Sequence, residues 1–268
     1  MASRIKKAQR AFESRNVKQA KQAHSRKYIQ EHMSEESSGM VNAQYLGEFV
    51  YGAVDGAVTT FAVVAGSAGA ALSPGIVIIL GFANLIADGF SMASGNFLSE
   101  RTQREYIEKE RKREEWETEN VPEGEKEEIR EIFRKKGFKG KDLERAVEII
   151  TSDKKVWVDT MMADELGLIK SPKTPWKTAA STYFGFIMIG IIPLLAYVLA
   201  YFHPFFGQNT FMLAVVMTGI ALAVIGVIKR YVTKKNLWKS VFETVFIGGA
   251  AAFIAYCVGF FLRWIVVL

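Results

Sequence analysis

Long apolar runs alternate with densely charged blocks along the chain, and this segregation constrains the fold more than any other feature. Residues 45–98 and 178–268 are nearly free of charge apart from one basic loop, whereas residues 1–44 and 99–177 are rich in charged side chains. A soluble fold mixes apolar and polar positions with the period of a helix or a strand, and runs of about 18 or more apolar residues are typical of membrane helices. The sequence therefore predicts an integral membrane protein.

Five apolar segments are long enough to cross a bilayer, which takes roughly 20 helical residues. They are expected at about residues 46–66, 74–98, 178–202, 209–229 and 241–266. The loops at 67–73 and 203–208 contain no Lys or Arg, while the N-terminal tail, the 99–177 block and the 229–239 loop carry the basic residues. Because basic loops stay in the cytosol, the pattern predicts a cytosolic N-terminus and a C-terminus on the other side.

The predicted fold class is an all-α membrane protein with a helical cytosolic domain inserted between the second and third spans. Its parts are a basic cytosolic tail (1–44), two membrane helices (45–98), the cytosolic domain (99–177) and three membrane helices (178–268). The second membrane helix is expected to continue as far as Glu119, because the residues from Ser99 onward lack Gly and Pro. After the interruption at Val121 and Pro122, shorter helices are expected at 123–136, 141–151 and 154–166.

Several classes of function find no support in the composition. The net charge of +6 does not indicate nucleic-acid binding, because Lys and Arg lie beside apolar segments as topology signals. The single cysteine, Cys257, leaves no disulfide framework and no Cys-based metal site. The first 40 residues are too polar for a signal peptide, and neither a Walker-type loop nor an H-E-x-x-H motif is present. No prosthetic cofactor is expected.

Two acids lie within otherwise apolar membrane segments. Asp55 interrupts the run 49–66, and Asp88 is the one charged residue in the run 72–98. A carboxylate near the centre of a bilayer costs roughly 2.5–3.5 kcal/mol on insertion scales, so such residues usually mark a functional site. The two acids therefore indicate a cation path through the membrane.

Polar and sulfur-containing side chains share helix faces with these acids. Asn84, Asp88 and Met92 recur at intervals of four residues, and Glu48 and Asp55 are seven apart in the first span. If the two faces meet, they line a path with carboxylates, an amide and a thioether. Oxygen ligands favour Mg, Ca or Mn, and a Met sulfur shifts the preference towards Fe(II). The alternative for Met92 is ordinary core packing.

A buried acid also responds to protons. Burial disfavours the charged carboxyl and a bound cation favours it, so a buried Asp can exchange a metal ion for a proton. This exchange is the elementary step of an antiporter, and we treat it as a hypothesis for the membrane acids.

Pairs of glutamates in the soluble domain form a second group of candidate metal ligands. Residues three apart share a helix face, so an E-x-x-E pair can offer two carboxylates to one ion. A mixed thioether and carboxylate cluster follows further along the chain. The candidates are Glu114, Glu117, Glu125, Glu128, Met161, Met162 and Glu165. The alternative is that these are solvated faces of Glu-rich helices paired with Lys and Arg.

Small residues in the first two spans indicate close helix packing. Gly52 and Gly56 form a G-x-x-x-G motif in the first span, and Ala83, Ala87 and Gly89 lie in the second. Such residues let helices approach closely, so these two spans are expected to pack against each other or across a dimer axis. Ordinary small-residue packing without a specific dimer is the alternative.

Three motifs, in the right order and at the right separations, resemble the vacuolar iron transporter family. They read YGAVDGAVTTFAVVAG at 51–66, NLIADGFSMASGNFLS at 84–99 and WVDTMMADELGL at 157–168. The resemblance covers roughly residues 45–268. It implies a homodimer of five-helix protomers whose cytosolic domain collects divalent metal. It also implies a pore that moves Fe(II), and often Mn(II), out of the cytosol against protons.

The same resemblance assigns roles to individual residues. Asp55 and Met92 would be pore ligands, and Glu48 would lie at the cytosolic entrance. The candidates of the soluble domain fall on the metal-binding positions of the family. Plant-type members carry carboxylates where this chain has Asn84 and Gln44, so the second-span acid here is Asp88. The long basic tail resembles prokaryotic relatives, which favours a plasma membrane over a vacuole.

Two other functions compete with transport. A membrane sensor or buffer would bind metal in the soluble domain without moving it across the bilayer. An intramembrane aspartyl protease would use the two membrane acids to activate water, but the G-x-G-D motif is absent and the Glu-rich domain has no evident part in proteolysis. The leading interpretation is a dimeric exchanger of divalent metal and protons, with no nucleic-acid partner.

Overall fold

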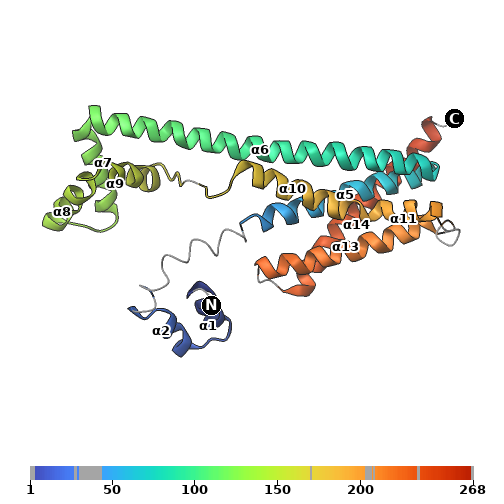
Figure 1. Cartoon of the computed structure of the whole chain (residues 1–268), viewed down its shortest axis with the longest axis horizontal. Coiled ribbons are helices and arrows are strands. Elements are labelled where there is room, and N and C mark those ends of the chain that lie inside the picture. Colours follow the sequence, from blue (N-terminus) through green and yellow to red (C-terminus); the bar gives the residue numbers. More distant parts are fainter. Residues whose placement is uncertain are drawn as a thin grey trace. The chain divides into compact units, whose positions relative to one another are not determined.

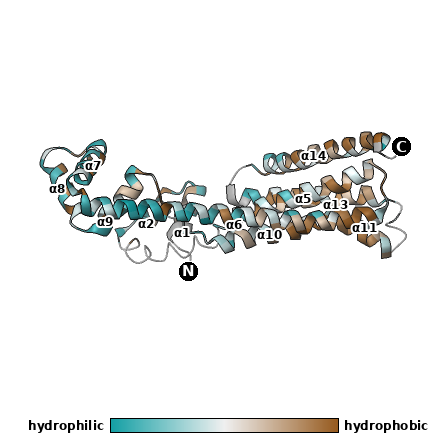
Figure 2. Cartoon of the chain, turned by 90° about the horizontal axis from the view of Figure 1, so that it is seen from above, coloured by the Kyte–Doolittle hydropathy of each residue, from teal (hydrophilic) through white to brown (hydrophobic). Residues whose placement is uncertain are grey.

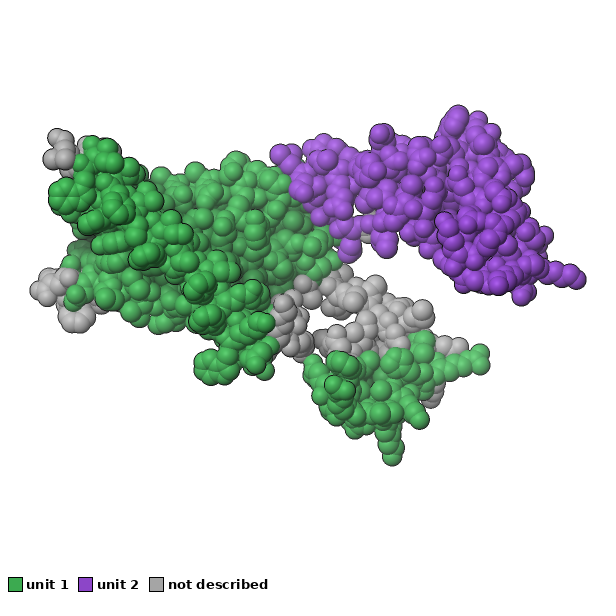
Figure 3. Space-filling view, turned by 180° about the vertical axis from the view of Figure 1, so that it is seen from behind, with its two compact units in different colours: residues 1–97, 173–268 green, residues 98–172 purple. Residues whose placement is uncertain are grey.

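A computed structural model of the chain describes residues 4–26, 29, 44–169, 171–202, 207, 209–233 and 236–266. Every regular element among these residues is a helix (Figure 1). The chain forms two compact units, one of residues 1–97 and 173–268 and one of residues 98–172, which we call unit 1 and unit 2 (Figure 3). Most of the basic tail between α2 and residue 44, and most of the 203–208 loop, lie outside the described residues.

Unit 1 contains the apolar helices. Its elements are α1 (Arg4–Glu13), α2 (Val17–Ala23), α5 (Leu46–Gly69), the first part of α6 (Pro74–Asn120), α10 (Pro175–Gly190), α11 (Ile192–Phe202), α13 (Thr210–Thr233) and α14 (Leu237–Val266). Helices α5, α6, α13 and α14 are each long and apolar enough to cross a membrane, whereas α10 and α11 are so only as a pair bent by 41°. The brown segments of Figure 2 correspond to these helices. Four to five candidate spans thus support an integral membrane protein.

Helix α5 packs closely on α10 through glycines. A Cβ atom at Gly52 would lie 2.1 Å from the carbonyl oxygen of Thr182, and one at Gly56 would lie 2.3 Å from that of Phe186. The two backbones therefore touch where side chains would keep them apart. The prediction that this G-x-x-x-G motif packs on the second span is wrong, because α10, which follows unit 2 in the sequence, occupies it. Packing of the spans across a dimer axis stays a prediction.

Helix α14 also packs closely on α5 through glycines. A Cβ atom at Gly259 would lie 1.9 Å from the carbonyl oxygen of Gly66, and one at Gly69 would lie 2.3 Å from that of Tyr256. Backbone contacts with α10 and α14 hold α5 on more than one side. Asp55 therefore sits on a helix whose position is fixed by its neighbours.

Of the small residues in the membrane part of α6, Gly81 and Gly89 face α11 and α10, whereas Ala83 and Ala87 are exposed. A Cβ atom at Gly81 would meet the side chain of Leu194 at 2.2 Å, and one at Gly89 would meet Phe186 at 3.1 Å. Asn96 Nδ2 donates a hydrogen bond of 2.8 Å to Thr182 Oγ1. Side chains rather than bare backbones thus make this contact.

The predicted continuation of the second span is confirmed, since α6 runs unbroken from Pro74 to Asn120. In Figure 2 its colour changes along its length from hydrophobic to hydrophilic. It ends where the sequence requires: Val121 leaves the helical region (φ −132°, ψ 45°) before Pro122, which disfavours an α conformation in the residue preceding it. Pro122 then opens the next helix, where its missing N–H costs nothing.

Unit 2 consists of the end of α6 and four short elements. These are α7 (Pro122–Lys135), α8 (Gly140–Thr151), α9 (Lys154–Thr160) and the π-helical turn η1 (Met161–Glu165). Gly137, at φ +98°, follows α7 in a conformation that favours glycine. Asp153 Oδ1 caps α9 by accepting hydrogen bonds from the backbone N–H groups of Lys155 and Val156.

The helix expected over 154–166 is divided by the π turn. Its mark is the hydrogen bond of 3.2 Å from the Leu166 N–H to the carbonyl of Met161, five residues back. Met161 lies in the core of the unit with Ile129, Val147 and Trp157. The π turn thus joins α9, whose Trp157 lies in the core, to Glu165.

Candidate metal centres

The carboxylates of unit 2 gather where α6 and α7 meet. One carboxylate oxygen each from Glu114, Glu117 and Glu125 lies within 4.8 Å of the others. Glu114 and Glu117 share a face of α6 because they are three residues apart, and Glu125 belongs to the first turn of α7, where the helix dipole favours an acid. We call these three residues the carboxylate triad. The turn at Pro122 brings them together.

Two members of the triad are buried with unsatisfied oxygens. Glu114 is 1% exposed and Glu125 is 6% exposed. In each, Oε2 is buried and has no hydrogen-bond partner among the described residues. A buried carboxylate oxygen without a partner is costly, and a cation is the ligand that would satisfy it. The donor set therefore fits a divalent metal ion.

The raised pKa values of the glutamates indicate an excess of negative charge at the triad. Burial and the carboxylates of Glu128, Glu114, Glu117 and Glu165 raise the pKa of Glu125 to about 7. Partial desolvation and then the charge of Glu128 raise the pKa of Glu165 to about 7, although much of its side chain is exposed. Burial also raises the pKa of Glu114, although Arg113 acts against it. Glu128 and Glu165, both exposed, thus lie close enough to act on the triad.

Glu110 and Arg113 belong to this region but were not among the predicted residues. Arg113 forms ion pairs with Glu110, Glu114 and Glu117 at 3.0, 2.8 and 2.9 Å. Glu110 precedes Glu114 by four residues, so helical spacing alone could have indicated it. The role of Arg113 had no comparable signal, because Lys and Arg recur between residues 101 and 113 of this helix.

The two methionines proposed as ligands lie in apolar surroundings. Met161 packs with Ile129 and Trp157, and Met162 packs with Ile107 and Val158. Both side chains are buried. Their structural role is thus evident in the core, next to the turn that ends at Glu165.

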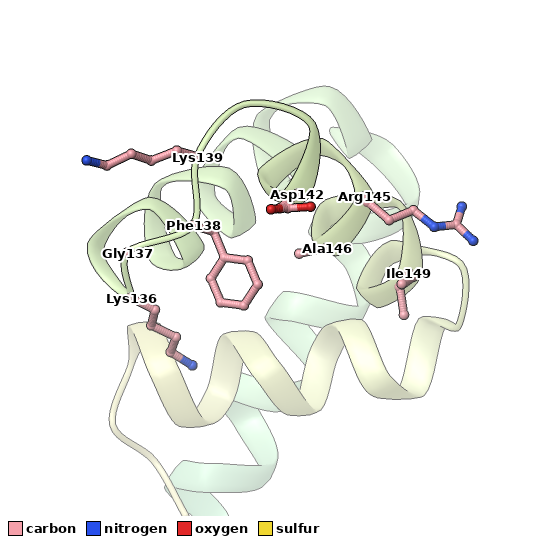
Figure 4. Close-up of a pocket in the computed structure, with 8 residues that line it drawn as sticks. All are labelled: Lys136, Gly137, Phe138, Lys139, Asp142, Arg145, Ala146 and Ile149. Carbon is pink, nitrogen blue, oxygen red and sulfur yellow. The ribbon is translucent and has the colours of Figure 1, made fainter.

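A surface hollow in unit 2 has the opposite character to the triad. Lys136, Lys139 and Arg145 line it together with Asp142 and the ring of Phe138, which points into the hollow (Figure 4). None of the predicted metal ligands is among its lining residues. A lining with more cations than acids repels a metal ion, so this hollow does not compete with the triad as a metal site.

Within unit 1 both membrane acids lie beside residues that face α10: Gly56, next to Asp55, and Gly89, next to Asp88, are each close to Phe186. Both acidic side chains are half-buried. Asn84 Nδ2 is buried without a hydrogen-bond partner among the described residues. Met92 packs against the apolar cluster that contains Phe61 and Phe186. The predicted residues of both spans thus lie in unit 1, close to α10.

Glu48 is held by a basic residue. Lys173 Nζ lies 2.5 Å from Glu48 Oε1, and the Glu48 side chain is 15% exposed. Its other oxygen, Oε2, is buried without a hydrogen-bond partner in the described part of the chain. The pairing joins residues 125 positions apart, so no local pattern could have revealed it.

Several proteins named as vacuolar iron transporters are similar to this chain over most of its length. A vacuolar iron transporter of Toxoplasma gondii is 34% identical over 270 residues, covering 98% of this chain and 89% of its own. A vacuolar iron transporter of Plasmodium falciparum is 31% identical over 264 residues, covering 96% and 95%. Vacuolar iron transporter 1 of Arabidopsis thaliana is 34% identical over 211 residues, covering 78% and 83%.

The basic tail does not separate this chain from such relatives. The alignment with the Toxoplasma protein takes in 98% of the chain, which leaves little of the tail outside it. Because these relatives are named as transporters, the chain is not interpreted as an enzyme, and the protease alternative loses its basis. The profile described as VIT family matches residues 46–260, and the chain belongs to the VIT family.

Proposed function

We propose that this protein transports Fe(II), and also Mn(II), out of the cytosol in exchange for protons. The observation that carries the proposal is the carboxylate triad with its buried oxygens that lack hydrogen-bond partners, in a chain whose membrane helices carry two further, half-buried acids. Relatives named as vacuolar iron transporters support iron as the transported metal.

Unit 2 is proposed to capture the metal. The triad supplies oxygen ligands, and Glu128 and Glu165 add negative charge beside it. Met161 and Met162 enter the proposed ligand set through the family resemblance alone, since their contacts are apolar. Divalent ions prefer carboxylate oxygens, and a thioether would add selectivity for Fe(II) over Mn(II).

The membrane acids are proposed to pass the metal and carry the proton. Asp55 and Asp88 are half-buried in an apolar setting, where a negative charge is costly without a cation or a proton beside it. Asn84 and Met92 would complete the path, and Glu48 would mark its cytosolic entrance. Exchange of the metal for a proton at these acids is the proposed basis of antiport.

A homodimer with a cytosolic N-terminus belongs to the same proposal. The half-buried state of Asp55 and Asp88 in a single chain supports a second copy, because membrane acids are expected to face protein or a water-filled cavity. Exposed apolar side chains on α6, such as Ile79, Ile86 and Phe90, offer a surface for lipid or for that copy. The absence of Lys and Arg from loop 67–73 supports the orientation. Alignments with relatives named as vacuolar iron transporters reach into the tail, so the tail favours neither a plasma membrane nor a vacuole.

Flux measurements test transport and coupling separately. Purified protein in liposomes with an acidic interior should accumulate Fe(II), and uptake should fall when the pH gradient is removed. Metal binding without uptake would overturn the transporter and support a membrane sensor. Uptake that ignores the gradient would overturn antiport but leave transport standing.

A further inference from the structure

We infer that Arg113 is a resident counter-ion of the carboxylate triad, which an incoming divalent metal must displace. Arg113 would then set the metal affinity of unit 2 without being a ligand. The inference rests on the proposed function, because it takes the triad as the site of metal capture.

The guanidinium of Arg113 forms ion pairs with three carboxylates and donates hydrogen bonds to those of Glu110 and Glu117. Nε pairs with Glu110 Oε2 at 3.0 Å, Nη2 with Glu114 Oε1 at 2.8 Å and Nη1 with Glu117 Oε2 at 2.9 Å. The planar fork of arginine suits such multiple pairing, which the single ammonium of a lysine reproduces poorly. One positive charge thus neutralises part of a strongly acidic region.

Two of these three carboxylates belong to the triad. Glu114 gives one oxygen to Arg113, while its other oxygen is buried without a partner in the described residues. Among those residues, Arg113 makes every ion pair that the structure shows for the triad. A metal that draws in Glu114 and Glu117 therefore competes with the guanidinium for the same negative charge. Since arginine does not lose its proton in proteins, the competition is resolved by movement of the side chain.

Arg113 has room to move. Its side chain is 45% exposed, whereas that of Glu114 is 1% exposed. The acid is fixed inside the unit, and the cation reaches it from the surface. Displacement would return the guanidinium to water, where it is well solvated, while the carboxylates stay in place for the metal. The empty site would thus stay partly neutralised without a bound ion.

Titration of the full-length protein in detergent with Mn(II) tests this inference at one fixed pH. The variants are Arg113→Gln, which removes the charge, Arg113→Lys, which keeps the charge but loses the fork, and Arg101→Gln as the matched control. Arg101 lies on the same helix and pairs with Glu105, outside the triad. We expect Arg113→Gln to bind Mn(II) at least about threefold tighter, in line with the loss of partly exposed ion pairs. Arg113→Lys should fall between, and Arg101→Gln should match the unaltered protein.

Thermal unfolding supplies a second measurement. Arg113→Gln should melt earlier than the unaltered protein without metal, and Mn(II) should raise its melting temperature by more, because tighter binding stabilises more. If Arg113→Gln fails to fold, the order of Mn(II) affinity between Arg113→Lys and the unaltered protein decides.

Unchanged or weaker Mn(II) binding by the Arg113 variants would overturn the inference and make Arg113 a positioning residue. Failure of the proposed function looks different, since Mn(II) binding would then be indifferent to Glu114→Gln. If Mn(II) binding depends on Glu114 but not on Arg113, the inference about Arg113 is wrong while the proposed metal site stands.

Discussion

The two units place their acids in different ways. In unit 2, carboxylates from α6 and α7 crowd within 4.8 Å of one another, and two of them have buried oxygens without partners among the described residues. In the membrane helices of unit 1, Asp55 and Asp88 are single acids on separate helices, each surrounded by apolar and small residues. Many ligands at one place favour retention of an ion, whereas sparse ligands let it leave again. A transporter needs both, because an ion must bind well enough to enter and weakly enough to move on.

Replacing one acid in each unit is the strongest test of whether the two units have different roles. Asp55→Asn should reduce Fe(II) uptake into liposomes by at least about tenfold, which corresponds to about 1.4 kcal/mol, because it removes a membrane charge needed for passage. Binding of Mn(II) to unit 2 should persist. Glu114→Gln should instead weaken Mn(II) binding by about tenfold and leave more of the uptake at saturating metal.

Glu105→Gln is the matched control, since Glu105 lies on α6 and pairs with Arg101 away from the triad. Identical losses of binding and uptake in Asp55→Asn and Glu114→Gln would show that metal capture and metal passage are not separated between the two units.

Acidity should affect unit 2 through Glu125 and Glu165. The pKa of each is raised to about 7 without metal, so both carboxyls are largely protonated at pH 6 and largely charged at pH 8. A metal must displace these protons, and we expect the Mn(II) affinity of the full-length protein to fall by about tenfold or more from pH 8 to pH 6. Calorimetry in buffers of different ionisation enthalpy would report the protons released. An affinity that is flat over this range would contradict the prediction.

Without metal, the stability of the folded protein should depend on pH in the opposite direction to the metal affinity: it should fall as the pH rises. Because the folded-state pKa of these groups lies above their ordinary value of 4.5, the folded protein binds more protons than the unfolded chain between about pH 4.5 and pH 7. The contribution of these groups to stability is present at the acid end of that window and is lost as the pH rises through 7. Thermal unfolding at several pH values checks this, and added Mn(II) should restore stability most at high pH.

The smallest expected effect concerns the sulfur of Met92. Met92→Leu keeps the volume that packs against the apolar cluster but removes the thioether. Fe(II) uptake should fall by about threefold while Mn(II) uptake changes less, because sulfur favours the softer ion. Parallel flux measurements with the two ions check it. Equal losses would assign Met92 to packing alone.

Features that depend on local spacing could be predicted from the sequence. The shared face of Glu114 and Glu117 follows from helical periodicity, and the end of α6 follows from Pro122. The long course of α6 followed from the lack of Gly and Pro after residue 98. In each case a few neighbouring residues contain the information.

Features that depend on distant partners could not be predicted. The G-x-x-x-G motif of α5 predicts a close contact with another helix, but nothing in the motif specifies α10 rather than α6. Lys173 reaches Glu48 across 125 positions of sequence. Arg113 looks like other basic residues of α6 until its three carboxylate partners are seen together. Tertiary contacts select these partners from several chemically equivalent candidates.

The π turn at Met161–Glu165 accommodates one residue more than an α turn over the same rotation about the helix axis. Loss of a single residue here would let the chain close as an ordinary α turn, with the segments before and after it keeping their directions. The remaining side chains would be redistributed around the axis, so Met161 in the core with Trp157 and Glu165 beside Glu128 would not both keep their places. The extra residue thus lets one short segment serve the apolar core and the acidic region at the same time.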